Sequence, residues 1–189
     1  MPKCTWAGIN ELVREYHDRE WGRPVHNDDR LFEMLSLEIF QAGLRWTLIL
    51  QRRNALREAF ARFRITEVAQ YDEEMIKRLI ADARIIRNKR KITAVVQNAR
   101  AIVTLHENDM SFDEFVWQHK SPVVNHWQTS DEVPQAPAAA KALAHRLKQA
   151  GFMFVGPVVC YSFMQAVGIV NDHLMGCPAR DKYDGKKRD

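Results

Sequence analysis

Residues 157–170, P-V-V-C-Y-S-F-M-Q-A-V-G-I-V, decide the fold. This stretch is apolar at nearly all positions and carries no charge. Pro157 suits the first turn of a helix, where an N–H would have no partner. A helix that is apolar on nearly all sides is buried on nearly all sides. We therefore expect a central helix here, with Cys160 packed in it as a small hydrophobe.

The rest of the chain shows mainly the spacing of amphipathic helices. Residues with capping chemistry precede several of these segments, and Gly151 follows another at the position where helices end. We find no hairpin or alternating strand, and Val123-Val124 is too short to count as one. The fold class expected is all-α, with about eight to ten helices in one domain. Predicted helices begin after Asn27, at Thr47 (to Phe63), after Asp72, at Ile85 (to about Glu107), after Ser111 (through Trp117) and at Ala138 (to Ala150).

Length and composition fit an ordinary globular protein. The chain has 189 residues, and no apolar run approaches the roughly 18 that span a membrane. It shows no secretory signal, and three cysteines do not make a disulfide framework. We therefore expect a cytoplasmic protein. Nothing in the sequence suggests more than a monomer, which is the state we expect. The folded domain is expected over residues 1–177, followed by a basic, mobile tail over residues 178–189.

The segment after the central helix, residues 171–177, reads N-D-H-L-M-G-C. His173 and Cys177 are four positions apart, a spacing that would put both on one face if they lay on a helix or at its frayed end. Cys4 and His17 lie near the other end of the chain. If the four met, a closed Cys₂His₂ set would bind zinc and act on stability rather than on chemistry. The alternative is that they are ordinary thiols and surface imidazoles.

Residues 37–46, L-E-I-F-Q-A-G-L-R-W, place an acid within an apolar helical face. Burying Glu38 is costly unless it has a partner or a function. Gly43 permits a left-handed turn that would present Leu44, either as a core anchor or as a wedge into DNA. Aromatic residues gather in the same quarter of the chain, as a small core or as a pocket for a flat cationic group: Trp6, Tyr16, Trp21 and Trp46.

The formal net charge is +4, which permits a nucleic-acid partner without requiring one. The densest basic run spans residues 84–100 and holds six Arg or Lys residues and no acid. Such a run is either a solvated helix face or a surface that contacts phosphates. The sequence alone leaves both interpretations open.

Five motifs together resemble the 3-methyladenine DNA glycosylase I family. They cover the chain in unbroken order from Cys4 to Cys177. The resemblance implies a fold of the helix–hairpin–helix DNA-repair class. It also implies base-excision repair: the family hydrolyses the N-glycosidic bond of N3-methyladenine in double-stranded alkylated DNA, releasing free 3-methyladenine without cutting the strand. The motifs are C-T-W (4–6), Y-H-D-R-E-W-G-R-P (16–24), L-F-E-M-L-S-L-E (31–38), Q-A-G-L-R-W (41–46) and F-V-G-P-V-V-C-Y-S-F-M-Q-A-V-G-I-V-N-D-H (154–173).

The resemblance also assigns roles to individual residues. It implies that Glu38 and Tyr16 recognise the base and serve catalysis, that Trp46 stacks on it, and that Trp6 and Trp21 line the pocket. It implies that Gln41 and Leu44 fill the gap left by the flipped nucleotide. The hairpin and the basic run beside it imply DNA contacts at Arg84, Arg87 and Lys89. The structural zinc of the family maps onto Cys4, His17, His173 and Cys177.

Three positions depart from the family pattern. Val13 stands where an aromatic residue is common, Arg84 where the hairpin has glycine, and Pro157-Val158 where small polar residues are expected. Two alternatives stay open. Val13 and Arg84 leave room for a sensor of alkylation damage that grips DNA without cutting it. The weaker alternative is a zinc-stabilised interaction protein with no role at DNA.

Overall fold

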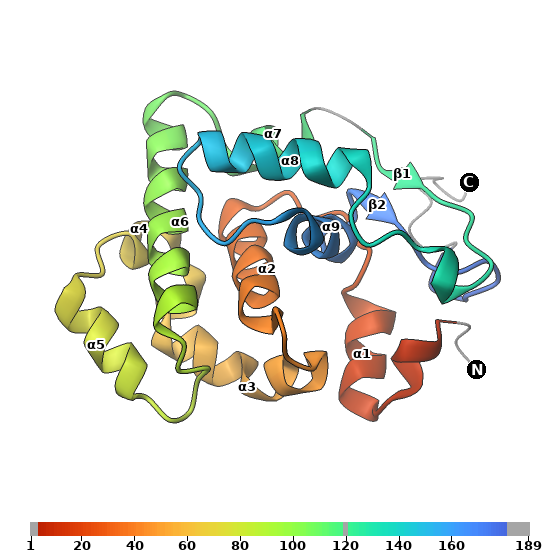
Figure 1. Ribbon diagram of the computed structural model, residues 1–189, viewed down its shortest axis with the longest axis horizontal. Helices are drawn as coiled ribbons and strands as arrows, with labels where there is room; N and C mark the ends of the chain where they lie inside the picture. The colour runs from red at the N-terminus through yellow and green to blue at the C-terminus, as the bar shows by residue number, and fades with distance from the viewer. Residues whose placement is uncertain (1–3, 119–120, 181–189) are drawn as a thin grey trace.

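The computed structural model describes residues 4–118 and 121–180, and nearly all of its regular structure is helical, as expected (Figure 1). Nine α-helices and three short 3₁₀-helices fall within these ranges, with one pair of two-residue strands. In chain order they are η1 (Thr5–Gly8), α1 (Glu11–Arg19), α2 (Asp28–Gln41), α3 (Trp46–Ala59), η2 (Ala61–Phe63), α4 (Ile65–Val68), α5 (Glu73–Ala81), α6 (Lys89–Glu107), α7 (Phe112–Trp117), β1 (Val123–Val124), η3 (Ser130–Glu132), α8 (Ala138–Gln149), α9 (Pro157–Ala166) and β2 (Val170–Asn171).

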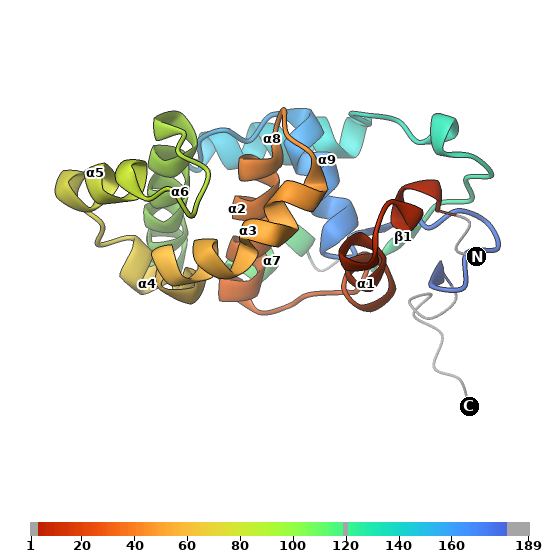
Figure 2. The ribbon, with the colours of Figure 1, turned by 90° about the horizontal axis from the view of Figure 1, so that it is seen from below.

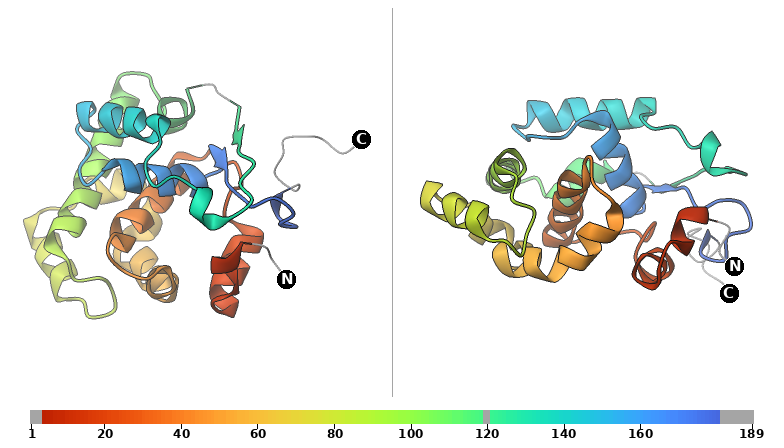
Figure 3. Two further views of the ribbon diagram at one scale, coloured as in Figure 1. Left: turned by 45° about the vertical axis from the view of Figure 1, so that its right-hand side comes forward. Right: turned by 60° about the horizontal axis from the view of Figure 1, so that its bottom comes forward.

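Helices α2 and α9 pack against each other at the centre of the molecule (Figures 1 and 3). Helix α8 covers α9 on one side, while α3 and α6 pack against α2. Cys160 and Phe163 of α9 are fully buried, which confirms the central helix. Helices α5 and α6 lie at one end of the molecule, and α1 lies at the other (Figures 1 and 2).

Capping side chains begin the helices where the sequence indicates. Asn27, Asp72 and Ser111 each accept a hydrogen bond from a backbone N–H in the first turn of the helix that follows. Ser111 and Glu114 also form the full capping box. Gly151, with φ at +86°, follows α8. These signals are local, so the sequence alone was enough to place them.

Two helix boundaries differ from the expectation. Helix α6 begins at Lys89 rather than Ile85, because Asn88 caps it. Ile85 lies in the turn before the helix, and its side chain is buried there. This explains why Ile85 fits the apolar pattern although it lies outside the helix. The helix predicted over residues 47–63 ends at Ala59, since residues 61–63 have φ between 49° and 57°.

The strand pair is a correction to the sequence analysis, which dismissed Val123-Val124. Val123 pairs with Val170 and Val124 with Asn171, in parallel. The pair fastens the loop after α7 to the chain that leaves α9. Two-residue strands that are distant in sequence leave no periodic signal.

The folded part also extends beyond Cys177. Ala179 and Arg180 are buried, and Arg180 Nη1 donates to the carbonyl oxygen of His173 at 2.8 Å. Residues 178–180 of the predicted tail therefore belong to the fold, while residues 181–189 lie outside the described residues. No described helix has the length and apolar character that crossing a bilayer requires.

At Gly168, just after α9, the backbone lies directly against the backbone of Arg23 and Pro24. Gly168 has φ at +78°, and a Cβ there would lie 2.5 Å from the backbone carbon of Arg23 and the backbone nitrogen of Pro24. Val25 N–H bonds the carbonyl of Val167 beside it, at 3.1 Å. The two backbones therefore leave no room for a side chain.

We expect Gly168→Ala to lower the free energy of unfolding by at least about 3 kcal/mol, since it adds a backbone clash to the left-handed strain. Gly151→Ala is the matched control. Its φ is +86°, but a Cβ there meets nothing within 4 Å, so about 1 kcal/mol is expected. Urea denaturation measures both. Equal losses would show that the close approach does not matter.

Candidate functional site

A cavity of about 970 Å³ opens where η1, α1, the end of α2, the start of α3 and α9 meet. The loop over residues 130–135 closes its far side. All seven residues expected in or beside a base pocket line this one cavity: Trp6, Tyr16, Trp21, Glu38, Gln41, Leu44 and Trp46. Val13 and Val158, two of the departures from the family pattern, line it as well.

Glu38 lies in the last turn of α2 and is only 6% exposed. Its carboxyl group has no hydrogen bond or ion pair with any other described residue. Burial raises the pKa of Glu38 to about 8. A buried acid without a partner is costly to the fold, and such groups mark sites that act on a ligand. Of the two explanations for a buried Glu38, a partner within the described part of the chain is therefore excluded.

Tyr16 of α1 stands beside Trp46 at the start of α3, with ring centroids 5.0 Å apart and planes inclined by 55°. The Tyr16 hydroxyl and the Trp46 Nε1–H are buried, and neither has a partner within the described part of the chain. Burial and, after it, the nearby Glu38 raise the pKa of Tyr16. The hydroxyl therefore stays protonated and can donate to a ligand.

Trp6 and Trp21 form the opposite aromatic wall. Their rings meet edge to face, with centroids 4.9 Å apart. Trp6 also packs its ring against His17, and Trp21 packs against His173. The wall of the cavity is thus in direct contact with two of the expected metal ligands.

The turn after α2 forms the rim of the cavity. Gly43 has φ at +78°, as predicted, and Leu44 is 37% exposed, which excludes the core-anchor interpretation. Leu44 N–H donates to the carbonyl oxygen of Gln41 at 2.6 Å, and Gln41 Nε2 donates to the carbonyl oxygen of Leu44 at 3.3 Å. The two expected gap-filling side chains therefore stand on one closed turn.

An ion cluster that the sequence analysis missed holds the helices around the cavity. Arg53 of α3 is 7% exposed and donates to Glu20, at the end of α1, and to Glu33 of α2. Burial alone would raise the pKa of Glu33, but Arg53 and Arg57 outweigh it, so the pKa is lowered. The cluster joins the three helices that carry Tyr16, Glu38 and Trp46.

A second polar cluster lies on the far wall. The buried carboxylate of Asp172 accepts four hydrogen bonds, two of them from cavity-lining residues of α9. Asp172 stood in the N-D-H motif, but nothing in the sequence showed its partners. The donors are Asn125, Trp127, Tyr161 and Gln165.

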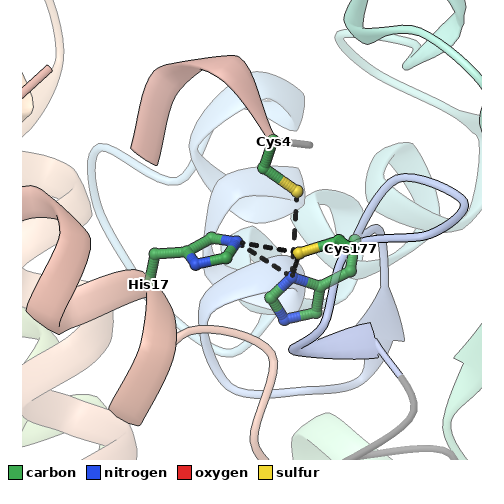
Figure 4. A group of neighbouring side chains, drawn as sticks. Cys4, His17 and Cys177 are labelled. Atoms are coloured by element: carbon green, nitrogen blue, oxygen red, sulfur yellow. Dashed lines mark hydrogen bonds between the residues drawn. The ribbon is translucent and has the colours of Figure 1, made fainter. Parts of the chain in front are cut away.

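Cys4, His17, His173 and Cys177 come together at the side of the cavity, with their ligand atoms all within 4.8 Å of one another (Figure 4). All four are buried. His17 Nε2 lies 3.2 Å from His173 Nδ1 and 3.5 Å from Cys177 Sγ. The two imidazoles are therefore not surface residues, and the four residues form a candidate metal centre.

Hydrogen bonds orient both imidazoles of this centre. His17 Nδ1 lies 2.7 Å from a carboxylate oxygen of Asp18, and His173 Nε2 lies 3.2 Å from the carbonyl oxygen of Trp21. Because both oxygens can only accept, each of these nitrogens carries the ring N–H and donates a hydrogen bond to the oxygen. The other nitrogen of each ring then presents a lone pair to the centre, as in metal-binding histidines.

The basic run is divided between buried, paired and free residues. Arg84 is bonded to Asp82 and Glu58, while Lys91 is 5% exposed and bonded to backbone carbonyls. Arg87, in the turn between α5 and α6, and Lys89, the first residue of α6, are exposed, and their side chains have no bond to another described residue. Of the three expected DNA contacts, these two keep an unpaired charge.

Comparisons with known proteins agree with this geometry. The family model described as methyladenine glycosylase matches residues 6–181. DNA-3-methyladenine glycosylase 1 of Escherichia coli (strain K12) is 44% identical, over 99% of this chain and 100% of that one.

Solved structures agree as well. A crystal structure of 3-methyladenine DNA glycosylase I, 42% identical, matches with a TM-score of 0.90 over 93% of this chain and 97% of the other. A Tyr-to-Phe variant of 3-methyladenine DNA glycosylase I in complex with 3-methyladenine is 32% identical, with a TM-score of 0.92 over 97% of this chain and all of the other. This chain therefore belongs to the methyladenine glycosylase family.

Proposed function

We propose that this protein excises N3-methyladenine from double-stranded alkylated DNA by hydrolysing the N-glycosidic bond, as the first step of base-excision repair. One observation carries the proposal: Glu38, a buried acid without a partner, stands at the edge of an aromatic cavity. Family membership and the 3-methyladenine bound by a relative support it.

The chemistry of the substrate explains these residue types. Methylation at N3 gives the base a positive charge, which makes it a good leaving group and attracts it to aromatic faces. The carboxylate of Glu38 matches the charge and accepts from the exocyclic amine, while the Tyr16 hydroxyl bonds the base edge. Neutral adenine lacks the charge, so it gains less from entering the cavity.

The reaction needs little beyond this binding. The bond between the base nitrogen and the sugar C1′ breaks, and its electron pair leaves with the base and neutralises its charge. Water then bonds C1′ and releases a proton. No lysine lies among the described residues that line the cavity, and the buried Lys91 ammonium is bonded to carbonyls. We therefore propose a monofunctional enzyme without strand cleavage.

Zinc is the metal we propose for the Cys₂His₂ centre. Ligands at tetrahedral corners around one zinc ion are separated by about 3.3 Å between nitrogens and about 3.6 Å between nitrogen and sulfur. The corresponding distances here are 3.2 Å between the imidazoles and 3.5 to 3.9 Å from imidazole to sulfur. Four protein ligands leave no open position, so the ion would stabilise the fold and take no part in hydrolysis.

DNA contact is proposed through a helix–hairpin–helix formed by α5, residues 82–88 and α6. Arg87 and Lys89 supply free charges there, and the N-terminus of the 19-residue α6 favours a phosphate beside them. Arg84 contributes less, because Asp82 and Glu58 already neutralise it.

The double substitution of Arg87 and Lys89 by Ala is expected to reduce the salt dependence of DNA binding, lowering the slope of log K against log salt by about 2. Arg84→Ala is the control and should change the slope by well under 1. Fluorescence anisotropy with an undamaged duplex at several salt concentrations measures both. A larger effect at Arg84 than at the pair would place the phosphate contacts elsewhere.

One assay tests the proposed function. Methylated duplex DNA is incubated with the protein, and the free bases are separated by chromatography. We expect 3-methyladenine to appear and 7-methylguanine to stay in the DNA. Binding of methylated DNA without release of any base would support a sensor of damage. No binding to DNA would support an interaction protein that uses its metal centre for stability alone. Sedimentation of the same sample checks the predicted monomer.

A further inference from the structure

Lys91 is an unusual member of the basic run because it is turned inward. It lies in the first turn of α6 and is 5% exposed. Its ammonium donates to the carbonyl oxygens of Phe40 at 2.8 Å and Ala42 at 2.6 Å. These two carbonyls are at the end of α2, where a helix has no N–H left to satisfy them.

The bonded carbonyls lie beside the turn that forms the rim of the cavity. Ala42 follows Gln41 directly, and its N–H bonds the carbonyl of Glu38 at 3.2 Å. Gly43 then reverses the chain and presents Leu44. A shift of the Ala42 carbonyl would therefore move the turn that carries Gln41 and Leu44.

The other end of Lys91 is tied to the hairpin. Lys91 N–H donates to the Asn88 side chain that caps α6, only one residue beyond the exposed Arg87. Arg52 of α3, the helix that follows the rim turn, also bonds this segment, since its Nη1 donates to the carbonyl oxygens of Ala83 and Arg84. The hairpin and the rim turn are thus joined through a buried charge that sits favourably at the negative end of the α2 dipole.

We propose that Lys91 is a positioning residue: it fixes the Gln41–Leu44 turn relative to the DNA-contacting hairpin, so that Leu44 enters the duplex when the hairpin grips the backbone. The inference rests on the proposed function. Lys91 is not among the residues that line the cavity. Its loss should therefore impair opening of the duplex and leave recognition of the base intact.

Lys91→Met tests this, because methionine keeps much of the side-chain length and apolar stem but cannot bond the carbonyls. We expect single-turnover excision from methylated duplex to fall about 10- to 100-fold, the size of effect that a displaced positioning group produces. Excision from methylated single strands, which need no wedge, and affinity for free 3-methyladenine should stay within about twofold. Leu44→Ala should show the same selective loss of excision from duplex. The double variant Lys91→Met with Leu44→Ala should retain as much duplex activity as the less active of the two single variants.

The matched control is Lys141→Met, an exposed lysine of α8 that does not line the cavity. It should leave excision from duplex and from single strands, and therefore their ratio, unchanged. Equal losses on both substrates with Lys91→Met would reduce Lys91 to a general role in stability and overturn the proposal. An unchanged duplex rate would overturn it as well. If Lys91→Met does not fold, Lys91→Gln, which can still bond one carbonyl, takes its place.

A second readout works without catalysis. A duplex with 2-aminopurine beside an abasic analogue becomes fluorescent when a wedge unstacks the probe. Wild-type protein should raise this signal, and Lys91→Met should raise it several-fold less at saturating protein. A protein that released no base but still showed this difference would contradict the proposed function and support the role of Lys91. Release of base, with equal fluorescence signals from wild type and Lys91→Met, would support the proposed function and overturn the role of Lys91.

Discussion

Glu38→Gln is expected to lower excision of 3-methyladenine by at least about 100-fold, because an amide keeps the shape of the side chain but cannot match the positive charge of the base. Among the described residues that line the cavity, Asp172 is the other carboxylate, and it already accepts four hydrogen bonds. Single-turnover release of base from methylated duplex measures the effect. A variant with wild-type activity would refute the assignment of Glu38.

The pH dependence gives this prediction a second readout. Because burial raises the pKa of Glu38 to about 8, the free protein holds the group mainly protonated at pH 7. Cationic substrate favours the carboxylate and must first displace the proton. kcat/KM should therefore rise about tenfold per pH unit toward pH 8 and level off above it. Glu38→Gln should remove this limb of the profile.

Stability should change in the opposite sense to activity. The folded state holds the proton of Glu38 up to about pH 8, whereas the unfolded chain releases it near pH 4.5. The folded state thus binds more protons between these values, so stability falls as pH rises through that window, by up to about 5 kcal/mol. Glu38→Gln should be more stable than wild type at pH 9, with the gap closing toward pH 5. Denaturation at the two pH values measures it, and a less stable variant at pH 9 would mean that Glu38 has a partner when it is ionised.

The features that the sequence predicted well are those with local causes. Asn27, Asp72 and Ser111 cap helices through contacts within four residues, and the apolar run of α9 needs no partner to be identified as buried. The site residues came instead from the resemblance. From the residues alone, Glu38 and the four aromatic residues allow two interpretations, a ligand pocket or a small core.

The features that the sequence did not predict depend on contacts between distant residues. Arg53 meets Glu20 across 33 positions, and Lys91 meets Phe40 across 51. In the sequence both cations look like solvated surface charges, because their type says nothing about which distant oxygen will accept from them. The β1–β2 pair was missed for the same reason.

Loss of the metal is the other large effect expected. Without a cation, burial raises the pKa of the Cys4 thiol to about 12 and lowers the pKa of His173 to about 4, so these two ligands are neutral and attract their neighbours only weakly. Cys177→Ser should therefore lower the free energy of unfolding by at least about 4 kcal/mol and reduce zinc to well below one ion per chain, which elemental analysis measures. His145→Ala, an exposed imidazole outside the centre, should change neither.

The metal should also matter to excision before the domain unfolds. His17 adjoins Tyr16 in sequence, and its ring contacts Trp6, while Trp21 packs on His173, so three aromatic side chains of the cavity are linked to the centre. Stripping the ion with a chelator should loosen these rings and lower excision about tenfold or more at temperatures where the circular dichroism of the helices is unchanged. Restored zinc should restore the rate. Full excision by protein shown to be metal-free would mean that excision does not depend on the metal, and the metal centre would then have a role in stability alone.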